Sequence, residues 1–371
     1  MRTGTKIVLG GLAAGTVLAG VAGTAATLFA ARLLARRLRR QPWIGFLGSA
    51  LRNRGLRGDD LRGQTALITG SSRGLGLALA EHFADQGCRI ALCARDEREL
   101  ARARQQVERL GAEVCAVACD VSRPEEVEHA LRVARRHFGQ IDILVNNAGI
   151  ICVGPLESQS RDDFREAMDV IFWGTVHPTL AVLPAMIERG WGRIVNITSI
   201  GGKVSVPHLL PYNCAKFATV GFSQGLHAEL RRFGIHVLTV MPGLMRTGSH
   251  LNARFKGNHH AEYRWFAASA TMPLLSMSAE RAAGKIVEAA RRNQAELTLG
   301  WPAKVLAGAH AVSPSLTAEA LALVNRILPR APRGVTGSKS GREIESAMRP
   351  SSLTALGRRA ARRYNQIEEA A

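Results

Sequence analysis

The stretch TALITGSSRGLGLALAEHF, residues 65–83, encodes a strand, a tight turn and a helix in immediate succession. Thr65–Thr69 is a short apolar run of strand length, glycines follow it, and apolar residues recur at helical spacing from Leu75 to Phe83. Glycines in the turn permit positive φ angles and let backbone N–H groups at the helix N-terminus face a phosphate. A glycine loop in this position predicts a site for the diphosphate of a nucleotide.

Short apolar runs of strand length recur along the chain, and charged or amphipathic helical segments separate them. These runs cover residues 89–93, 114–118, 141–145, 193–197 and 236–240. Strands that alternate with helices form a parallel sheet with helices on both faces. The predicted fold is therefore α/β, a doubly wound, Rossmann-like parallel sheet in a single catalytic domain with a helical C-terminal extension.

The length of the chain requires extensions outside this domain. One doubly wound domain needs roughly 250 residues, whereas the chain has 371. We assign the domain to residues 64–300. The other segments are a membrane anchor or signal-like segment with a basic flank (1–40), a linker (41–63), an apolar helical extension (301–330) and a basic, mobile tail (331–371) with a short basic helix near Leu353 to Tyr364. Two roles remain open for the apolar extension: a cap over a substrate cleft, or a helix against a membrane surface.

The N-terminal segment carries no charged residue from Ile7 to Ala31, which is long enough to cross the roughly 30 Å of a bilayer core as a helix. A cleaved signal peptide would share the basic start at Arg2 and Lys6, but its apolar core is usually shorter. Arginines follow the apolar run and place the next domain in the cytoplasm. They are Arg32, Arg36, Arg37, Arg39 and Arg40. We expect a membrane-associated protein with a cytoplasmic catalytic domain.

The formal net charge of +19 arises mainly from the two flanks, residues 32–62 and 330–363. Juxtamembrane arginines are attracted to anionic lipid headgroups, which explains this placement. The chain has neither a zinc-finger spacing nor an RNA-binding aromatic motif, so we expect no nucleic-acid partner.

The cysteines and histidines give no metal-site pattern. The six cysteines contain no CxxC pair and most lie in apolar runs, as reduced core cysteines do. His208, His259 and His260 have no carboxylate or cysteine at ligand spacing. We therefore predict no metal.

Further motifs follow the glycine loop in a fixed order. They are Asp120-Val121, Asn146-Asn147-Ala148-Gly149, Ser199 in Asn196-Ile197-Thr198-Ser199, Tyr212-Asn213-Cys214-Ala215-Lys216, and Pro242-Gly243 with Thr247. Together with the Gly-xxx-Gly-x-Gly spacing of the loop, they resemble the short-chain dehydrogenase/reductase family over about 180 residues. The resemblance implies an oxidoreductase that moves a hydride between nicotinamide and an alcohol or carbonyl.

The resemblance implies that Ser199, Tyr212 and Lys216 are catalytic. Tyr212 and Lys216 stand four apart, on one face of a helix. A free phenol has a pKa of about 10, and a unit charge at about 4 Å is worth roughly 4 kcal/mol at an effective dielectric near 20. We therefore expect Lys216 to lower the pKa of Tyr212, the general acid/base, and to hold the nicotinamide ribose. Ser199 would polarise the carbonyl oxygen.

The resemblance also implies a set of cofactor-binding residues. They are Gly70, Ser72, Arg73, Gly74, Leu75, Gly76, Arg95, Asp120, Val121, Asn147, Ala148, Gly149, Tyr212, Lys216, Pro242, Gly243 and Thr247. Arg95 ends the second strand, where a carboxylate would accept the ribose hydroxyls of NAD. A guanidinium there, with Arg73 in the loop, favours the 2′-phosphate of NADP(H) over NAD(H). Asp96 comes one residue after the ribose-binding position.

One position departs from the family pattern. Ile171 stands in Asp169-Val170-Ile171 where relatives carry an asparagine that links the lysine to solvent through a water. Isoleucine cannot hydrogen-bond, so this proton relay is slow or takes another route. The alternative function is a catalytically impaired nucleotide-binding sensor or a membrane scaffold.

The predicted substrate-binding regions are mostly apolar. Their apolar residues are Ile150, Ile151, Val153, Val206, Leu209, Leu210, Trp265, Phe266, Met272, Leu274 and Leu275. We expect a lipophilic alcohol or carbonyl compound of the steroid, retinoid, 3-oxoacyl or aldehyde type. We also expect a homodimer or homotetramer.

Overall fold

The computed structural model describes residues 60–332, 337–347 and 355–367. The predicted membrane anchor and almost all of the predicted linker lie outside these residues. The fold below is that of the unit from Asp59 onwards.

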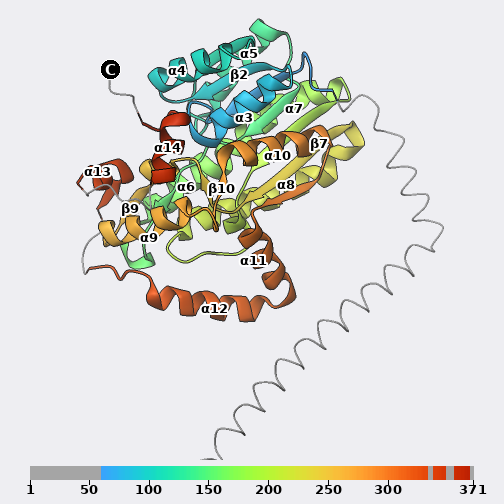
Figure 1. Cartoon of the computed structure of the whole chain (residues 1–371). Coiled ribbons are helices and arrows are strands. Elements are labelled where there is room, and N and C mark those ends of the chain that lie inside the picture. The colour runs from blue at the N-terminus through green and yellow to red at the C-terminus, as the bar shows by residue number, and fades with distance from the viewer. Residues whose placement is uncertain (1–59, 333–336, 348–354, 368–371) are drawn as a thin grey trace, which may run out of the picture. The chain divides into compact units, whose positions relative to one another are not determined.

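A seven-stranded sheet forms the centre of this unit, with the strand order β11-β7-β6-β4-β1-β2-β3 (Figure 1). The strands are β1 (Thr65–Thr69), β2 (Arg89–Ala94), β3 (Val114–Ala118), β4 (Ile143–Asn146), β6 (Gly192–Ile197), β7 (Ile235–Pro242) and β11 (Glu296–Leu299). All neighbouring pairs are parallel. The predicted doubly wound parallel sheet is therefore confirmed, and β11 is the strand that the apolar runs did not predict.

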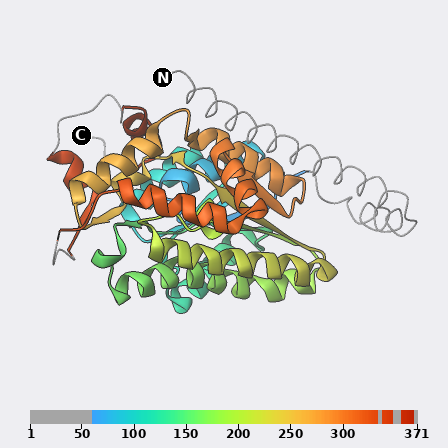
Figure 2. The same cartoon turned by 90° about the horizontal axis from the view of Figure 1, so that it is seen from below.

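Helices cover both faces of the sheet (Figure 2). One face carries α3 (Gly74–Asp85), α4 (Glu97–Glu108) and α10 (Ala279–Arg291), and the other carries α5 (Pro124–Phe138), α7 (Gly174–Glu188) and α8 (Leu210–Leu230). Each face has its own apolar cluster, one around Leu77 and Phe83 and the other around Leu144 and Met186. Every residue of β1 is buried, as both faces of a parallel sheet require.

A continuous helical run joins α6 (Arg161–Ala167), the π-helical segment Met168–Trp173 and α7. Among the described residues, this run, Arg161–Glu188, is the one segment long and apolar enough to cross a membrane. Half of its most apolar part is buried within the domain, where Val182 and Met186 pack against the sheet. We therefore assign the run to the protein core.

Short elements extend the carboxyl edge of the sheet. A three-stranded sheet contains β12 (Ser338–Ser340), β9 (Arg254–Lys256) and β5 (Cys152–Val153), and a two-stranded sheet contains β8 (Met245–Arg246) and β10 (Met277–Ser278). Helix α9 (His259–Thr271) packs on β9 through Tyr263 and Phe266. Single 3-10 turns lie at Leu156–Ser158, Ile200–Gly202, Arg231–Phe233 and Ser249–Leu251.

The segment after β11 folds into two helices, α11 (Trp301–Val312) and α12 (Pro314–Ile327), at the lower side of the coloured part of Figure 1. Large apolar side chains on these helices are exposed, with Val312 at 87% and Ile327 at 83%. Only Ala303 and Thr317 are buried on these two helices. An apolar surface of this kind usually marks an interaction site.

The short basic helix predicted near Leu353 to Tyr364 is present, but two parts of the tail are not mobile. Helices α13 (Gly341–Ser346) and α14 (Ala355–Arg363) pack on the domain, and α14 lies near α3 and α4 (Figure 1). The basic composition suggested a solvated tail, but Arg363 pairs with Glu81 of α3 at 2.8 Å. Tyr364 is buried in the main apolar core. Composition alone could not reveal these long-range partners.

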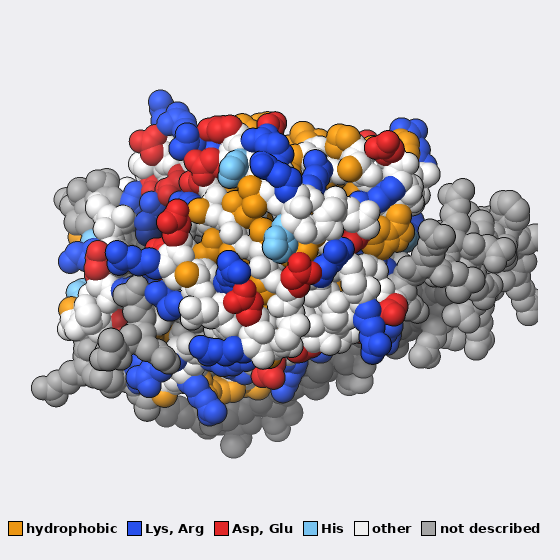
Figure 3. Space-filling view, turned by 90° about the horizontal axis from the view of Figure 1, so that it is seen from above, with side chains coloured by type: hydrophobic (Ala, Val, Ile, Leu, Met, Phe, Trp, Pro, Cys, Tyr) orange, Lys and Arg blue, Asp and Glu red, His pale blue; other side chains and the backbone are white. Residues whose placement is uncertain are grey.

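Basic and acidic side chains are interspersed over the face seen in Figure 3. Several of the basic residues pair with acidic neighbours on the same helix or turn, including Arg104 with Glu108 and Arg123 with Glu126. The positive charge of the described residues is thus partly balanced locally.

Candidate functional site

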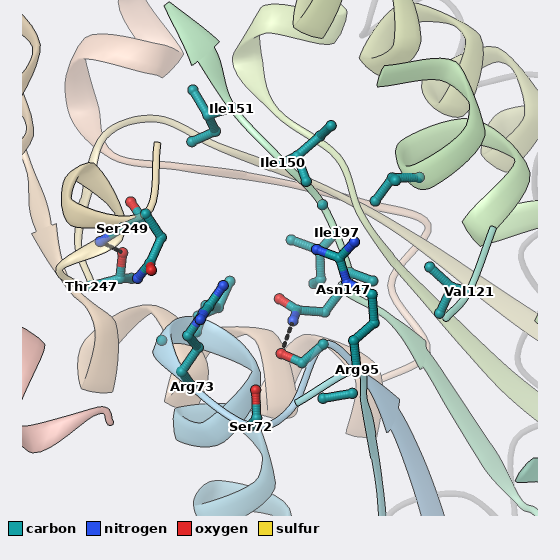
Figure 4. A pocket seen from close by; sticks show the side chains of 18 of the residues that line it. Ser72, Arg73, Arg95, Val121, Asn147, Ile150, Ile151, Ile197, Thr247 and Ser249 are labelled. Carbon is teal, nitrogen blue, oxygen red and sulfur yellow. Dashed lines mark hydrogen bonds between the residues drawn. The ribbon is translucent and has the colours of Figure 1, made fainter. Parts of the chain in front are cut away.

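A cavity of about 680 Å³ opens at the carboxyl ends of the strands (Figure 4). It lies where β1 and β4 are neighbours and the strand order reverses, the usual ligand position in open α/β sheets. Most of the predicted cofactor-binding residues line it. They are Gly70, Ser72, Arg73, Gly74, Leu75, Arg95, Asp120, Val121, Asn147, Ala148, Gly149, Tyr212, Lys216 and Thr247.

The glycine loop needs its glycines for two reasons. Gly70 and Gly74 have φ angles of 62° and 61°, which favour glycine. A side chain on Gly76 would overlap the carbonyl oxygen of Gly70, and a Cβ on Gly70 would lie 2.8 Å from the Cα of Ala148. The loop therefore packs closely on the end of β4 while α3 starts at Gly74 and points its N-terminus at the cavity. This arrangement fits a bound diphosphate.

Asn147 ties the end of β4 to this loop. Its Nδ2 donates to the carbonyl oxygens of Thr69 and Gly70, each at 3.0 Å, and its backbone N–H donates to Thr69 Oγ1 at 3.0 Å. The side chain thus fixes the two strand ends that flank the cavity.

The two predicted cations face the cavity but differ in their partners (Figure 4). Arg73 Nη1 lies 2.6 Å from Glu99 Oε1, whereas Arg95, with 58% of its side chain exposed, lies 3.8 Å from Asp120 Oδ2. Sequence reasoning missed Glu99, a buried residue in the first turn of α4. Asp96 is the N-cap of α4 and accepts the backbone N–H of Glu99 at 2.8 Å. Its carboxylate has this structural role.

The predicted catalytic residues lie together at the other end of the cavity. Tyr212 and Lys216 are on α8, and Lys216 Nζ donates to the carbonyl oxygen of Ile197 at 2.8 Å and lies 5.7 Å from the centre of the Tyr212 ring. Ser199 does not line the cavity itself. Its Oγ accepts the backbone N–H of Gly201 at 3.0 Å. A Cβ on Gly201 would lie 3.4 Å from Ser199 Oγ and 3.4 Å from Tyr212 Cε1, so the two side chains are close neighbours.

The expected effect of Lys216 on Tyr212 is not what the structure shows. Burial raises the pKa of the Tyr212 phenol, and the nearby Ser199 hydroxyl opposes that rise. Burial also lowers the pKa of Lys216 to about 7. A lowering of the Tyr212 pKa by Lys216 is therefore not seen in this structure, where burial has the largest effect on both groups.

Ile171 lies beside this lysine, in the π-helical segment. It is 1% exposed, and a Cβ on Gly149 would lie 3.8 Å from Ile171 Cγ1 and 3.9 Å from Lys216 Nζ. Ile171 packs with Ala167 and Ala215, and its carbonyl oxygen accepts the Thr175 hydroxyl at 2.8 Å. The neighbourhood of the lysine head group is apolar on this side.

The predicted motif Pro242-Gly243 and Gly76 do not line the cavity. The Gly243 N–H donates to the carbonyl oxygen of Leu299 at 2.9 Å, and a Cβ on Gly243 would lie 3.0 Å from Ala303 Cβ. Gly243 therefore connects β7 to β11 and α11.

Few of the residues predicted to bind substrate reach the cavity. Ile150 and Ile151 line it, whereas Val153 and Phe266 are buried in a separate cluster and Leu274 is exposed. Sequence reasoning missed a charged pair among the lining residues, Arg254 of β9 with Glu166 of α6. The two residues are 88 apart in sequence, so no local pattern joins them.

The cysteines are free thiols, and two of the three histidines singled out in the sequence, His208 and His259, have hydrogen-bond partners. Cys214 is exposed, the other cysteines are buried, and none forms a disulfide. His208 Nδ1 lies 2.9 Å from Glu262 Oε1, and His259 Nε2 lies 2.8 Å from the carbonyl oxygen of Gly337. Within the described ranges, no group of histidines, cysteines and carboxylates has the arrangement of a metal site.

Asn252 and Gln366 are among the further lining residues that were not predicted. Gln366 follows α14 and comes from the segment that was expected to be a mobile tail. No sequence pattern indicates that Gln366 lies on the cavity wall.

Comparisons with known proteins agree with this geometry. The family model described as short chain dehydrogenase matches residues 64–256. A Mycobacterium tuberculosis (strain CDC 1551 / Oshkosh) protein, SadH, whose name assigns it to the oxidoreductases, is 35% identical over 246 residues, which are 66% of this chain and 88% of that protein.

Solved structures are similar over the same part of the chain. L-sorbose reductase from Gluconobacter frateurii, in complex with NADPH and L-sorbose, has a TM-score of 0.59 and 28% identity, covering 66% of this chain and 97% of its own. An actinorhodin polyketide ketoreductase variant with NADPH has a TM-score of 0.58 and 30% identity, covering 64% of this chain and 95% of its own.

Proposed function

Because this chain belongs to the short chain dehydrogenase family and is an oxidoreductase of that family, we propose that it transfers a hydride between NADP(H) and a lipophilic alcohol or carbonyl compound. One observation carries the proposal: the glycine loop, two arginines, Tyr212 and Lys216 line a single cavity. A dinucleotide bound along this cavity would have its diphosphate at the N-terminus of α3 and its nicotinamide near Tyr212.

NADP(H) is the proposed cofactor rather than NAD(H). Arg73 and Arg95 offer positive charge on the cavity wall, where a 2′-phosphate would lie. Asp96 also lines the cavity, but its carboxylate is held by the backbone N–H of Glu99 as the cap of α4. The relatives named above whose structures contain NADPH support the same choice. Glu99 neutralises part of the charge of Arg73 and lowers the expected preference. When bound, the nicotinamide supplies or accepts the hydride.

Tyr212 is the proposed proton donor for carbonyl reduction. The raised pKa of its buried phenol keeps the proton on oxygen at neutral pH, as a donor to a developing alkoxide requires. Ser199 lies close to the phenol, and its hydroxyl is a second polar group for the substrate oxygen. Lys216, with a pKa near 7, exchanges protons readily in the same pH range and would hold the ribose.

A second candidate function is a nucleotide-binding sensor or scaffold with impaired catalysis. Ile171 favours it, because the side chain beside Lys216 offers no hydrogen bond for a proton relay. Ser199, Tyr212 and Lys216 are all present and adjacent, which favours the enzyme.

For the substrate we propose a ketone, aldehyde or secondary alcohol with an apolar body. Ile150 and Ile151 line the same cavity as Tyr212. The pair of Arg254 and Glu166 adds a polar edge that would suit a substrate with one polar group away from the reacting carbon. Steroid, retinoid, 3-oxoacyl and aldehyde substrates all meet this description.

We also propose that the protein is associated with a membrane and that its catalytic domain is cytoplasmic. The exposed apolar side chains of α11 and α12 support this, together with Lys304 and Arg326 on the same helices. No residue of α11 or α12 lines the cavity, so a membrane role suits them better than a cap over the substrate. A homodimer or homotetramer is supported by Leu180 and Ile187, which are exposed one heptad apart on α7.

The test uses the full chain purified in a mild detergent. Titration with NADPH and NADH is followed by fluorescence, and nicotinamide oxidation is then measured with a steroid ketone, retinal, a 3-oxoacyl thioester and a long-chain aldehyde. We expect tighter binding of NADPH and turnover of at least one carbonyl. Binding without turnover across the panel would favour the sensor, and folded protein that binds neither nucleotide would refute the proposal.

A further inference from the structure

The residues that follow α14 lie directly on the glycine loop. The N–H of Gly74 donates to the carbonyl oxygen of Tyr364 at 2.9 Å. Asn365 Nδ2 donates to the carbonyl oxygens of Ser72, at 2.8 Å, and Glu99, at 2.9 Å. The tail therefore satisfies backbone groups of the glycine loop and of Glu99, the α4 residue whose side chain pairs with Arg73.

The next residue of the tail reaches the opposite wall of the cavity. Gln366 is 4% exposed, and its Oε1 accepts a hydrogen bond from Asn252 Nδ2. Asn252 belongs to the segment after β8 that also contains Thr247 and Ser249, which border the cavity in Figure 4. Gln366 Nε2 would lie 2.7 Å from a Cβ on Gly74. One side chain thus contacts the glycine loop and the segment that faces it.

Further contacts attach the residues around Asn365 and Gln366 to the domain. Arg363 pairs with Glu81 of α3, and Arg342 Nη2 donates to the carbonyl oxygen of Gln366 at 2.5 Å. Tyr364 is buried in the main core, and Ala361 fills the space that a Cβ on Gly248 would occupy. These contacts fix Asn365 and Gln366 relative to the domain.

We propose that Tyr364–Gln366 is a clasp on the dinucleotide site, a role that rests on the proposed function. The clasp joins the glycine loop to the 247–252 segment, so both walls are arranged for the diphosphate before it binds. With Oε1 occupied by Asn252, the Gln366 amide directs its N–H donors to the cavity, where the phosphate oxygens are acceptors. Dissociation of the cofactor then requires these contacts to open.

The substitutions that test the clasp keep the backbone as it is. Asn365 has a φ angle of 55°, so Asn365→Gly removes the amide without adding strain, and Gln366→Ala removes the second amide. Arg359→Ala, at an exposed position on α14, is the control. The full chain in detergent is titrated with NADPH, and the dissociation rate is measured by stopped flow against excess NADP⁺.

We expect the double variant Asn365→Gly/Gln366→Ala to raise the Kd for NADPH at least about tenfold, mostly through faster dissociation. The KM for NADPH should rise in parallel while kcat at saturating NADPH stays within about twofold, because the reacting end is untouched. Arg359→Ala should match the wild type.

An unchanged or tighter Kd in the double variant, with the wild type binding NADPH, would overturn the clasp alone. So would a fall in kcat and in the number of binding sites at an unchanged Kd, since that would indicate a purely structural role. Failure of the wild type to bind either nucleotide would instead overturn the proposed function. Faster hydrogen exchange at the Gly74 amide in the double variant would show, without cofactor, that the contact with the loop has been released.

Discussion

The carboxylate of Glu99 lies 2.6 Å from the guanidinium of Arg73, at the edge of the cavity where a 2′-phosphate would bind. Glu99 also accepts the Ser72 hydroxyl at 3.1 Å. It therefore orients the glycine-loop arginine and reduces its positive charge at the same time. The first prediction follows from this balance.

Glu99→Gln should increase the preference for NADPH over NADH by about three- to tenfold, because the amide keeps a hydrogen-bond acceptor but removes the negative charge. The ratio of the two Kd values from fluorescence titration measures this. Arg73→Met removes the positive charge instead and should lower the preference for NADPH over NADH. If Glu99→Gln leaves the ratio unchanged, the 2′-phosphate does not lie beside Arg73.

Tyr212→Phe should lower turnover by about 10² to 10⁴ while the Kd for NADPH stays within about twofold, because only the proton donor is lost. Steady-state kinetics and nucleotide titration measure the two quantities. Tyr263→Phe, a buried tyrosine of α9 outside the cavity, is the matched control and should keep most of the activity. Full turnover by Tyr212→Phe would rule out the phenol as the donor.

The stability of the domain should depend on pH through Lys216. Burial lowers the pKa of this lysine from 10.5 to about 7, so between these values the unfolded chain binds the proton more strongly. Acidification from pH 10 to pH 7 should therefore destabilise the wild type, and below about pH 7 this contribution should be constant.

Lys216→Met provides the reference for that measurement. The free energy of unfolding of the wild type minus that of the variant should fall by up to about 1.4 kcal/mol per pH unit as the pH decreases through this window. Guanidinium denaturation of the unit that starts at Asp59 gives both values. A difference that does not vary with pH would contradict the buried, weakly basic lysine.

Ile171→Asn should raise turnover if proton transfer limits it, because an amide beside Lys216 can hold a water. The same change should destabilise the protein by about 1–3 kcal/mol, since Ile171 packs among Ala167 and Ala215. Thermal unfolding and solvent isotope effects on kcat measure both effects. Ile171→Val, which stays apolar, should change neither by much, and an unchanged rate in Ile171→Asn would mean that the proton takes another path.

The exposed face of α11 and α12 should bind anionic lipid. The unit that starts at Asp59 should cosediment with vesicles containing phosphatidylserine, and Val312→Glu with Ile327→Glu should reduce the bound fraction at least about fivefold. Leu110→Glu, at an exposed leucine after α4, is the control. Equal binding by the double variant and the control would place the lipid contact elsewhere.

Local patterns were sufficient to predict every strand of the central sheet except β11, and most of the cavity. β1, the glycine loop and the start of α3 are contiguous, so their apolar spacing and their glycines specify strand, turn and helix directly. Parallel strands bring their carboxyl ends to one edge, which is why Asn147 and Asp120 could be expected beside Gly70. Tyr212 and Lys216 share a helix, so four-residue spacing was enough to pair them.

Burial and distant contacts were beyond the reach of such patterns. The pKa of Tyr212 depends on how much water the surrounding elements exclude, and the sequence carries no measure of that. Asn365 contacts Ser72 across 293 residues of chain, and Arg254 pairs with Glu166 across 88. Side chains so far apart meet through the packing of whole elements, and no spacing rule relates their positions in the chain. The amino-acid order was thus enough for the sheet apart from β11, for the glycine loop and for the helix of Tyr212, while the packed fold alone brought Glu99, Arg254 and Gln366 to the cavity.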